Sequence, residues 1–332
     1  GMEKGNQVLI KQAKLMASNP SERTICARLM NDRFALCLPR EEFDEKRVAD
    51  SIKELQREFS GNSFHLHTYM GVYEIRDRDE AVSIMVDKAN IAADTIKNNY
   101  DCCVAYYDEH LLEISIEQRR LLGEFEPALQ NDEFVMYLQP QVKRDGAAKG
   151  AEALVRWVHP SRGILTPYAF IDILENAGLI YKLDLYIWEK AAQKLAEWKE
   201  KGYGSYHISV NISTKDFYII DIYETFTGLI NKYGIAASNL HLEITETTLM
   251  TDFEKNMNII HKLQGVGFRV EIDDFGSGYS SLNMLKDISA DVLKIDMGFL
   301  RKSENEVKGQ DILESIITLA GKIGMDVITE GV

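Results

Sequence analysis

The chain has 332 residues, of which 45% are hydrophobic and 27% charged, and its formal net charge is −14. This length exceeds an ordinary domain of ~100–200 residues and predicts two domains. No apolar run reaches the ~20 residues that cross a bilayer and no secretory signal opens the sequence, so we expect a cytoplasmic protein without membrane contact. The negative charge argues against a nucleic acid polymer as partner, and an anionic ligand would need cations.

The first third of the chain alternates helices with short strands. Apolar spacing predicts helices at 8–18, 45–59 and 79–98, and strands at 24–29, 33–38, 64–73 and 102–107. We therefore expect an α/β sandwich of about 110 residues, followed by a charged amphipathic helix at 113–131. All four cysteines lie in this region without zinc-type spacing, which indicates reduced thiols.

From Phe134 onward the pattern changes to regular alternation of strand and helix. The candidate strands are 134–142, 150–158, 207–213, 240–245, 269–273, 292–296 and 326–329, and the candidate helices are 167–177, 183–201, 253–264 and 310–323. Such alternation favours a parallel sheet or barrel. The first two strands are joined only by a short segment with an Asp145-Gly146 turn, so this pair should be antiparallel.

Carboxylate or amide side chains stand where five of these strands stop. The set consists of Glu152, Asn211, Glu243, Glu246, Asp273, Asp274 and Glu330. In a parallel barrel these ends converge on the face that carries the chemistry. Oxygen ligands without His or Cys favour Mg²⁺ or Mn²⁺, and a cation would relieve the repulsion between the acids. Each acid taken alone is more simply a turn residue or helix N-cap, but five strand ends in register favour a site.

Two further features lie beside these acids. Lys294 is inside the apolar strand 292–296, and a lysine facing a barrel interior needs a charge partner, which favours a role in the site. The segment from Asp273 to Leu282 is rich in glycine and serine. It is either a mobile loop that approaches a ligand or only a long turn, and we favour the loop.

At these residues the sequence resembles the EAL family of cyclic di-GMP phosphodiesterases. The resemblance extends from Phe134 to Val332, and several separated motifs occur in the family's order. They are Tyr137 to Gln141, Glu152 to Trp157, Pro167 with Phe170-Ile171, Val210 to Ser213, Leu242 to Glu246, Asp273 to Gly276, Leu293 to Asp296 and Glu330 to Val332.

The resemblance implies an α/β fold, a (β/α)₈ TIM-like barrel with one antiparallel strand. It also implies hydrolysis of cyclic di-GMP to linear pGpG with Mg²⁺ or Mn²⁺, as two ions, in bacterial signalling. The molecule would be a homodimer through this domain. Two cations would make hydroxide available and stabilise the attacking and leaving oxygens.

The site residues that the resemblance implies fall into three groups. Glu152, Asn211, Glu243 and Asp273 would bind the first metal, with Asp273 bridging and Asp274 helping to hold the second. Lys294 would position the attacking water, and Glu330 would act as base or metal-associated acid. Gln139, Leu154 and Arg156 would contact the substrate, and Glu246 would anchor the loop that follows Asp273.

One departure from the family concerns closure of the barrel. The sequence stops at Val332, after the seventh strand, whereas the family continues through a helix and an eighth strand. We expect the eighth strand to be missing from this chain, so the activity of these 332 residues alone stays open. Leu138 and Thr329 replace a common Tyr and Ala without removing a ligand.

The first domain resembles the GGDEF diguanylate cyclase fold in outline. Met30 and Asn31 stand where two glycines should admit the nucleotide, and Arg33 stands where a carboxylate should be. Ser21 and Thr24 stand where the family's inhibitory Arg-x-x-Asp motif would be. We therefore expect no cyclase activity, but a regulatory or packing role. The expected domains are 1–112 (degenerate GGDEF-like), 113–131 (linker helix) and 132–332 (EAL).

Two other functions are compatible with parts of the sequence. One is a catalytically impaired receptor that binds cyclic di-GMP and signals to a partner. The degenerate first domain and the missing strand favour it, whereas the complete ligand set and Arg156 favour catalysis. An enolase-like lyase with Lys294 as base fits the acids but not the Glu-Ala-Leu signature.

Overall fold

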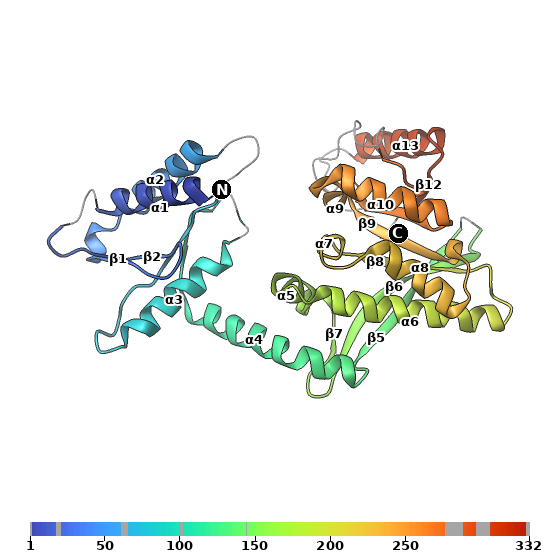
Figure 1. Ribbon diagram of the computed structural model, residues 1–332, viewed down its shortest axis with the longest axis horizontal. Helices are drawn as coiled ribbons and strands as arrows, with labels where there is room; N and C mark the ends of the chain where they lie inside the picture. The colour runs from blue at the N-terminus through green and yellow to red at the C-terminus, as the bar shows by residue number, and fades with distance from the viewer. Residues whose placement is uncertain are drawn as a thin grey trace. The chain divides into compact units, whose positions relative to one another are not determined.

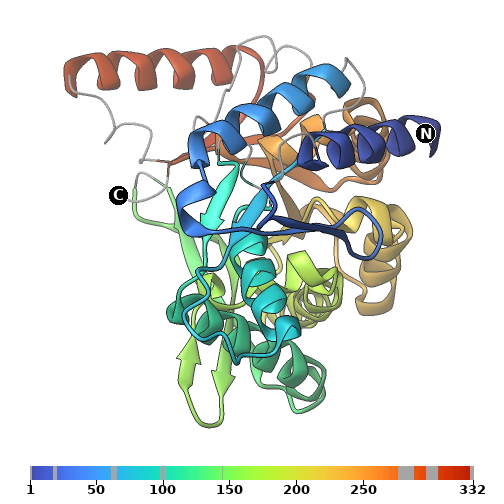
Figure 2. The same cartoon turned by 90° about the vertical axis from the view of Figure 1, so that its left-hand side faces the viewer.

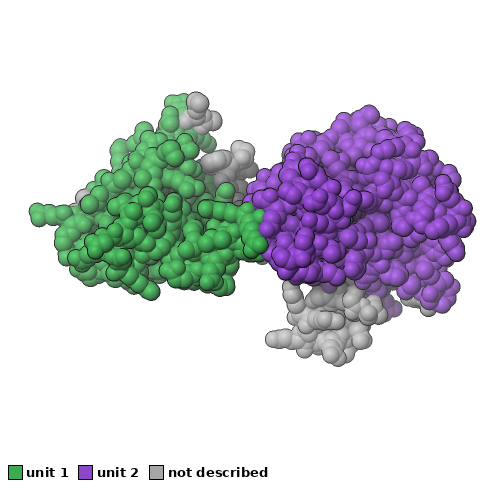
Figure 3. Space-filling model, turned by 90° about the horizontal axis from the view of Figure 1, so that it is seen from below, with its two compact units in different colours: residues 1–120 green, residues 121–332 purple. Residues whose placement is uncertain are grey.

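The structure, a computed structural model, describes residues 2–17, 21–60, 66–97, 99, 102–143, 145–275, 288–296 and 306–329. Its contacts divide the chain into two compact units, Gly1–Arg120 and Leu121–Val332 (Figure 3). The division falls inside α4 (Glu109–Gln130), and the finer domain boundaries stay a prediction. Across the described residues, no helix combines the length and apolarity needed to span a membrane.

The first unit is built from three helices and two short strand pairs in its described part. The elements are α1 (Met2–Ala17), β1 (Ile25–Arg28), β2 (Phe34–Cys37), η1 (Arg40–Glu42), α2 (Glu45–Phe59), β3 (Met70–Val72), α3 (Val82–Thr95) and β4 (Val104–Tyr106). Strands β1 and β2 pair antiparallel, and β3 and β4 pair parallel. Helices α1 and α2 lie side by side (Figures 1 and 2). All the elements expected in this region are present, with shorter strands.

Local chemistry explains several of these elements. Asp44 caps α2, where its side chain accepts a hydrogen bond from Arg47 N at 3.1 Å. Asn31 adopts a left-handed φ of 58° in the β1–β2 turn, a conformation that asparagine tolerates better than most residues. Gly71 allows α3 to approach β3, since a Cβ at this position would lie 1.8 Å from Ala89 O.

The second unit contains the sheet and the helices that cover it. Its strands are β5 (Phe134–Val142), β6 (Ala148–His159), β7 (Gly163–Leu165), β8 (His207–Ile212), β9 (Leu240–Thr245), β10 (Arg269–Phe275), β11 (Val292–Ile295) and β12 (Asp326–Thr329). Its helices are η2 (Pro167–Ala169), α5 (Ile171–Ala177), α6 (Ile180–Glu200), α7 (Asp216–Ile219), α8 (Ile222–Tyr233), η3 (Ala237–Asn239), α9 (Glu246–Thr251), α10 (Phe253–Val266) and α13 (Glu306–Lys322).

The sheet has the order β12-β11-β10-β9-β8-β6-β5, with β7 beside β6. Strand β5 is antiparallel to β6, and the strands from β6 to β12 on this path pair parallel. Helices α6, α8, α10 and α13 follow one another in the order of the strands (Figure 1). This topology confirms the predicted TIM-like α/β fold with one antiparallel strand. The sequence patterns missed β7, α7, α8 and α9.

The parallel strands have one apolar face and one polar face. Alternate residues such as Ile208, Val210, Leu242 and Ile272 belong to the hydrophobic core shared with the helices. Because successive side chains in a strand point to opposite faces, the residues between them point inward. That inner row contains Ser209, Asn211, His241, Glu243, Glu271, Asp273 and Lys294. The fold therefore concentrates polar groups inside the curled sheet.

Candidate active site

Lys294 stands at the centre of a cluster of carboxylates on the inner face of the sheet. Its Nζ donates hydrogen bonds to Glu152 Oε2 and Glu243 Oε2, both at 3.0 Å, and lies 3.3 Å from Asp273 Oδ1. The side chain of Lys294 is only 1% exposed. The three acids come from β6, β9 and β10, so the ends of these strands converge as the sequence predicts.

Strand register places the remaining predicted ligands beside these acids. Asn211 of β8 is paired with Glu243 of β9, and its Nδ2 donates to Glu152 Oε1 at 3.3 Å. Glu152 is itself paired with Ser209 on the neighbouring strand. Parallel pairing in register therefore gathers side chains that are far apart in the sequence within a few ångströms of Lys294.

The charges in this cluster are unevenly balanced. Burial raises the pKa of the Glu243 carboxyl well above its usual value, and the charges of Glu152, Glu271 and Asp273 raise it further. The positive charge of Lys294 acts in the opposite direction and lowers the pKa of Glu243. One ammonium group thus faces several carboxyl groups, an arrangement that an additional cation would stabilise.

Asp274 has an unusual backbone conformation at the end of β10. Its φ of 56° lies in the left-handed region, and its N–H donates to Asp273 Oδ1 at 2.9 Å. The β10–β11 register shifts between Ile272 and Phe275, which is the mark of a β-bulge or similar irregularity. Burial, followed by the charges of Asp273 and Asp296, raises the pKa of Asp274. Strain of this kind concentrates at functional sites, where it directs side chains.

The donors fit a hard divalent cation. Glu243 Oε1 is buried and has no hydrogen-bond partner in the described part of the chain. Carboxylate oxygens of Glu152, Glu243 and Asp273 converge on Lys294, and the side-chain amide of Asn211 contacts Glu152. Mg²⁺ and Mn²⁺ prefer oxygen donors of this kind. The oxygen set is thus compatible with the expected ions.

The candidate substrate residues share the β5–β6 hairpin. Glu152, Leu154 and Arg156 lie in one row of β6 and alternate with residues that belong to the hydrophobic core, and Gln139 of β5 is the register partner of Glu152. The Arg156 guanidinium lies over the Tyr137 ring, 5.7 Å from its centroid. The structure thus places Gln139, Leu154 and Arg156 on one face beside Glu152.

Of the remaining predicted site residues, the structure describes Glu246 but not Glu330. Glu246 is half-buried and is the first residue of α9. Glu330 and the segment 276–282 lie outside the described residues. Sequence reasoning missed Glu271, which is fully buried beside Glu243. The signal used for Lys294, a charged residue inside an apolar strand, would also have identified Glu271.

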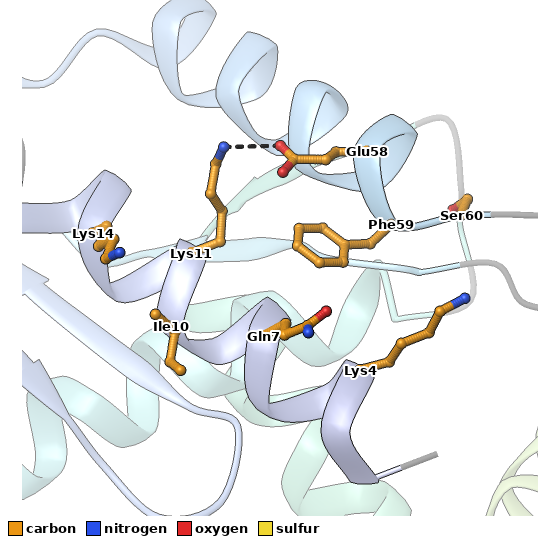
Figure 4. A pocket seen from close by; sticks show the side chains of 8 residues that line it. All are labelled: Lys4, Gln7, Ile10, Lys11, Lys14, Glu58, Phe59 and Ser60. Atoms are coloured by element: carbon orange, nitrogen blue, oxygen red, sulfur yellow. Dashed lines mark ion pairs between the residues drawn. The ribbon is translucent and has the colours of Figure 1, made fainter.

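A pocket in the first unit has a different character. It lies between α1 and α2 and carries Lys4, Lys11 and Lys14, with Phe59 among them (Figure 4). Lys11 is paired with Glu58 at 2.9 Å, and both side chains are about 40% exposed. An exposed pair of this kind contributes little to stability, and Glu58, the acid of this pocket, is held by that pair.

Comparison with known proteins agrees with this geometry. Residues 123–332 match the EAL domain family, and residues 1–101 match the diguanylate cyclase GGDEF domain. The chain therefore belongs to the EAL domain family, and within it the EAL domain follows a GGDEF domain.

Relatives with assigned names include two Pseudomonas aeruginosa proteins. The bifunctional diguanylate cyclase/cyclic di-GMP phosphodiesterase MucR is 29% identical over 100% of this chain and 49% of its own length. The cyclic di-GMP phosphodiesterase NbdA is 26% identical over 100% of this chain and 43% of its own length. The chain thus spans about half the length of these relatives.

Solved structures give the same result for the barrel. The PaMucR phosphodiesterase in complex with c-di-GMP is 33% identical, with a TM-score of 0.61, and covers 64% of this chain and 87% of that one. The EAL enzyme Bd1971, in its cAMP- and cyclic-di-GMP-bound form, is 30% identical, with a TM-score of 0.60, and covers 66% of this chain and 60% of that one.

Proposed function

We propose that this chain, or the longer protein that contains it, hydrolyses cyclic di-GMP to linear pGpG. The observation that carries the proposal is the convergence of Glu152, Glu243 and Asp273 on Lys294, with Asn211 beside Glu152. It occurs on the fold of an EAL domain, and a structure 33% identical to this chain holds c-di-GMP. Signalling in the cytoplasm and a homodimer through the EAL domain belong to the same proposal.

The proposed cofactor is Mg²⁺ or Mn²⁺, as two ions. Glu152, Asn211, Glu243 and Asp273 would hold the first ion, and Asp273 with Asp274 would hold the second. When bound, the ions supply an activated water near neutral pH and charge stabilisation for the attacking and leaving oxygens.

The side chains of this protein would orient the water, contact the substrate and accept a proton. Lys294 holds the three carboxylates together and is in reach of a water between them, which it would orient for in-line attack. Arg156 offers a planar cation to the phosphate or guanine, and Gln139 and Leu154 line the same face. Glu330 would accept the proton of the water, and Glu246 would hold the loop after Asp273.

The experiment measures pGpG formed from cyclic di-GMP by the full chain with Mg²⁺ or Mn²⁺. Glu152→Gln removes one charge from the cluster and should lower the rate by at least about 10²-fold, as for the loss of other transition-state charge contacts. Glu200→Gln, an exposed position at the end of α6, is the matched control and should retain full activity.

Tight binding of cyclic di-GMP without turnover under either metal would overturn hydrolysis and support the receptor function instead.

For the first domain we propose a regulatory or packing role without cyclase activity. The β1–β2 turn supports this, because Met30 and Asn31 close it through Arg33 N to Met30 O at 3.1 Å. Incubation with GTP should therefore yield no cyclic di-GMP.

A further inference from the structure

A second cluster of buried polar side chains lies deeper in the curled sheet, toward the amino ends of the strands. It consists of His207 on β8, His241 on β9 and Glu271 on β10, and each offers a possible metal-binding atom within 4.8 Å of the other two. The three residues are at most 6% exposed. They belong to the same inner row as Glu243, but none is among the residues proposed to bind Mg²⁺ or Mn²⁺.

Hydrogen bonds fix the protonated nitrogen of each imidazole. His207 Nε2 lies 2.7 Å from Gln141 Oε1, and an amide oxygen only accepts, so Nε2 carries the proton. His241 Nδ1 lies 2.5 Å from Glu271 Oε1, which accepts in the same way. His207 Nδ1 is therefore left with a free lone pair, and Gln141 stands behind His207 as an outer contact of the kind common around metal-binding histidines. The proton on His241 Nδ1 must move to Nε2 before Nδ1 and Glu271 can bind one ion.

The two imidazole rings stack face to face, with centroids 3.8 Å apart and an angle of 2° between their planes. The stack keeps nitrogens of both rings close to Glu271.

The third donor lacks a partner on one side. Glu271 Oε2 is buried without a hydrogen-bond partner among the described residues, and so is Glu243 Oε1. Glu271 and Glu243 are register partners on adjacent strands and lie within hydrogen-bonding reach of each other. Two acids that face each other in the interior are costly to bury, and a cation beside them would reduce that cost.

We propose that His207, His241 and Glu271 form a second metal site that binds a divalent cation of the zinc class. Two nitrogens and a carboxylate oxygen suit Zn²⁺, whereas Mg²⁺ prefers oxygen alone. Donors around zinc at ~2.0–2.1 Å lie at most about 4.2 Å apart. Since the donors here are separated by up to 4.8 Å, they must draw together on binding, and the two rings must leave their parallel stack.

The wall of the cluster offers a way to disturb it without removing a donor. A Cβ at Gly150 would lie 2.4 Å from His207 Nε2, so Gly150→Ala displaces the imidazole while every donor stays in the chain. Gln141→Ala removes the outer contact to His207 instead. Loss of such outer contacts weakens metal binding by ~10–100-fold.

The experiment uses the full chain, stripped with a chelator and then equilibrated with Zn²⁺ in a large excess of Mg²⁺ that fills the all-oxygen site. Elemental analysis should find about one zinc per chain, and Co²⁺ in its place should give visible absorption bands of a low-coordinate N/O site. His207→Gln and His241→Gln should each weaken Zn²⁺ binding by at least about tenfold. His261→Gln, an exposed histidine on α10, should leave it unchanged.

Zinc retained equally by the two histidine variants, or no zinc retained by the parent chain, would overturn the proposal. Circular dichroism shows whether the variants fold. If they do not, anomalous diffraction at the zinc edge from crystals of the parent chain decides the matter. A peak between His207 and His241, with the rings no longer parallel, supports the site, and its absence refutes it.

Discussion

Lys294 is the residue on which the acid cluster depends. It is 1% exposed and pairs with Glu152, Glu243 and Asp273, so its removal leaves buried carboxylates without a cation. Breaking a buried ion pair by removing one partner costs ~3–5 kcal/mol. Lys294→Met should therefore lower the free energy of unfolding by about that amount in the presence of a chelator, as measured by urea denaturation.

The same variant separates stability from chemistry. Mg²⁺ should restore part of the lost stability, because it supplies the missing positive charge, but phosphodiesterase activity should remain absent. Lys262→Met, at an exposed position on α10, serves as the control for loss of a lysine and should leave both quantities unchanged. Equal stability of Lys294→Met and the parent chain would show that the ion pairs contribute nothing.

The residue-level prediction of the site was possible because it needed only strand ends. Glu152, Asn211, Glu243 and Asp273 are read from apolar runs that stop at a polar residue. The signal used for Lys294, a charged residue inside an apolar strand, would also have found Glu271. The two histidines of the second cluster were not found, since their proximity depends on which neighbour each strand selects. Register is a tertiary property, set by packing of the apolar faces, and no local pattern in one strand contains it.

At the level of elements, two neighbouring acids connect α6 with α7. The carboxyl groups of half-buried Asp184 on α6 and buried Asp216 at the start of α7 lie within hydrogen-bonding reach, and Asp216 accepts from Ser213 N at 2.8 Å. Burial raises the pKa of Asp184 well above its usual value, and the charge of Asp216 raises it further, followed by that of Glu175. The folded protein therefore stabilises the protonated, neutral form of Asp184.

The sign of the pH effect follows from that direction. A carboxyl group whose pKa is raised on folding contributes stability below its unfolded pKa of ~3.9, and this contribution is lost as pH rises through its folded pKa. Asp184→Asn keeps a hydrogen-bond donor without the charge. We expect the variant to gain stability over the parent as pH rises from 4 to 8, measured by urea denaturation at both ends.

The neighbouring acid provides the contrast. Asp216→Asn weakens the bond to Ser213 N and should destabilise the protein at every pH in that range. If Asp184→Asn instead lost stability by the same amount at pH 4 and pH 8, then titration of Asp184 would have no part in the linkage between α6 and α7.

Gly71 tests the packing of a helix on a strand in the first unit. A Cβ at this position would lie 1.8 Å from Ala89 O and 2.6 Å from Ala93 N, and both atoms are backbone that cannot move aside alone. Gly71→Ala should therefore separate α3 from β3 and cost ~1–3 kcal/mol, the usual range for overpacking. Gly5→Ala on α1, in the same unit, is the matched control, because a Cβ there meets nothing within 4 Å. Equal unfolding temperatures of the two variants would contradict this.

Element types were predictable from the sequence to a large extent, whereas short elements were not. The 2.0 and 3.6 residue periods identified β5, β6, α2 and α6 because these elements are long and amphipathic. Strand β7 has three residues and α7 has four, so neither contains a full period. Their formation depends on pairing of β7 with β6 and on packing of α7 against α6, contacts that only the folded unit supplies.

At the scale of the whole molecule, the two units have cores of very different size. The main hydrophobic cluster runs from Leu121 to Met325 and lies entirely in the second unit. In the described part of the first unit, the fully buried apolar side chains are Val8, Ile52, Leu55, Ala92, Ile96 and Cys103. Since stability follows buried apolar area, we expect the first unit to unfold at the lower temperature.

Calorimetry of the full chain should resolve this order through ligand binding. Under the proposed function, cyclic di-GMP with a divalent cation binds only the folded barrel, so at 100 times its Kd it should stabilise the second unit by ~2.7 kcal/mol and raise the later transition. GTP should move neither transition, because the β1–β2 turn lacks the open glycines that would admit a nucleotide. In Glu152→Gln the shift with cyclic di-GMP should shrink if the cation contributes to binding. A ligand shift in the earlier transition would instead assign dinucleotide binding to the first unit and would contradict the proposed location of the site.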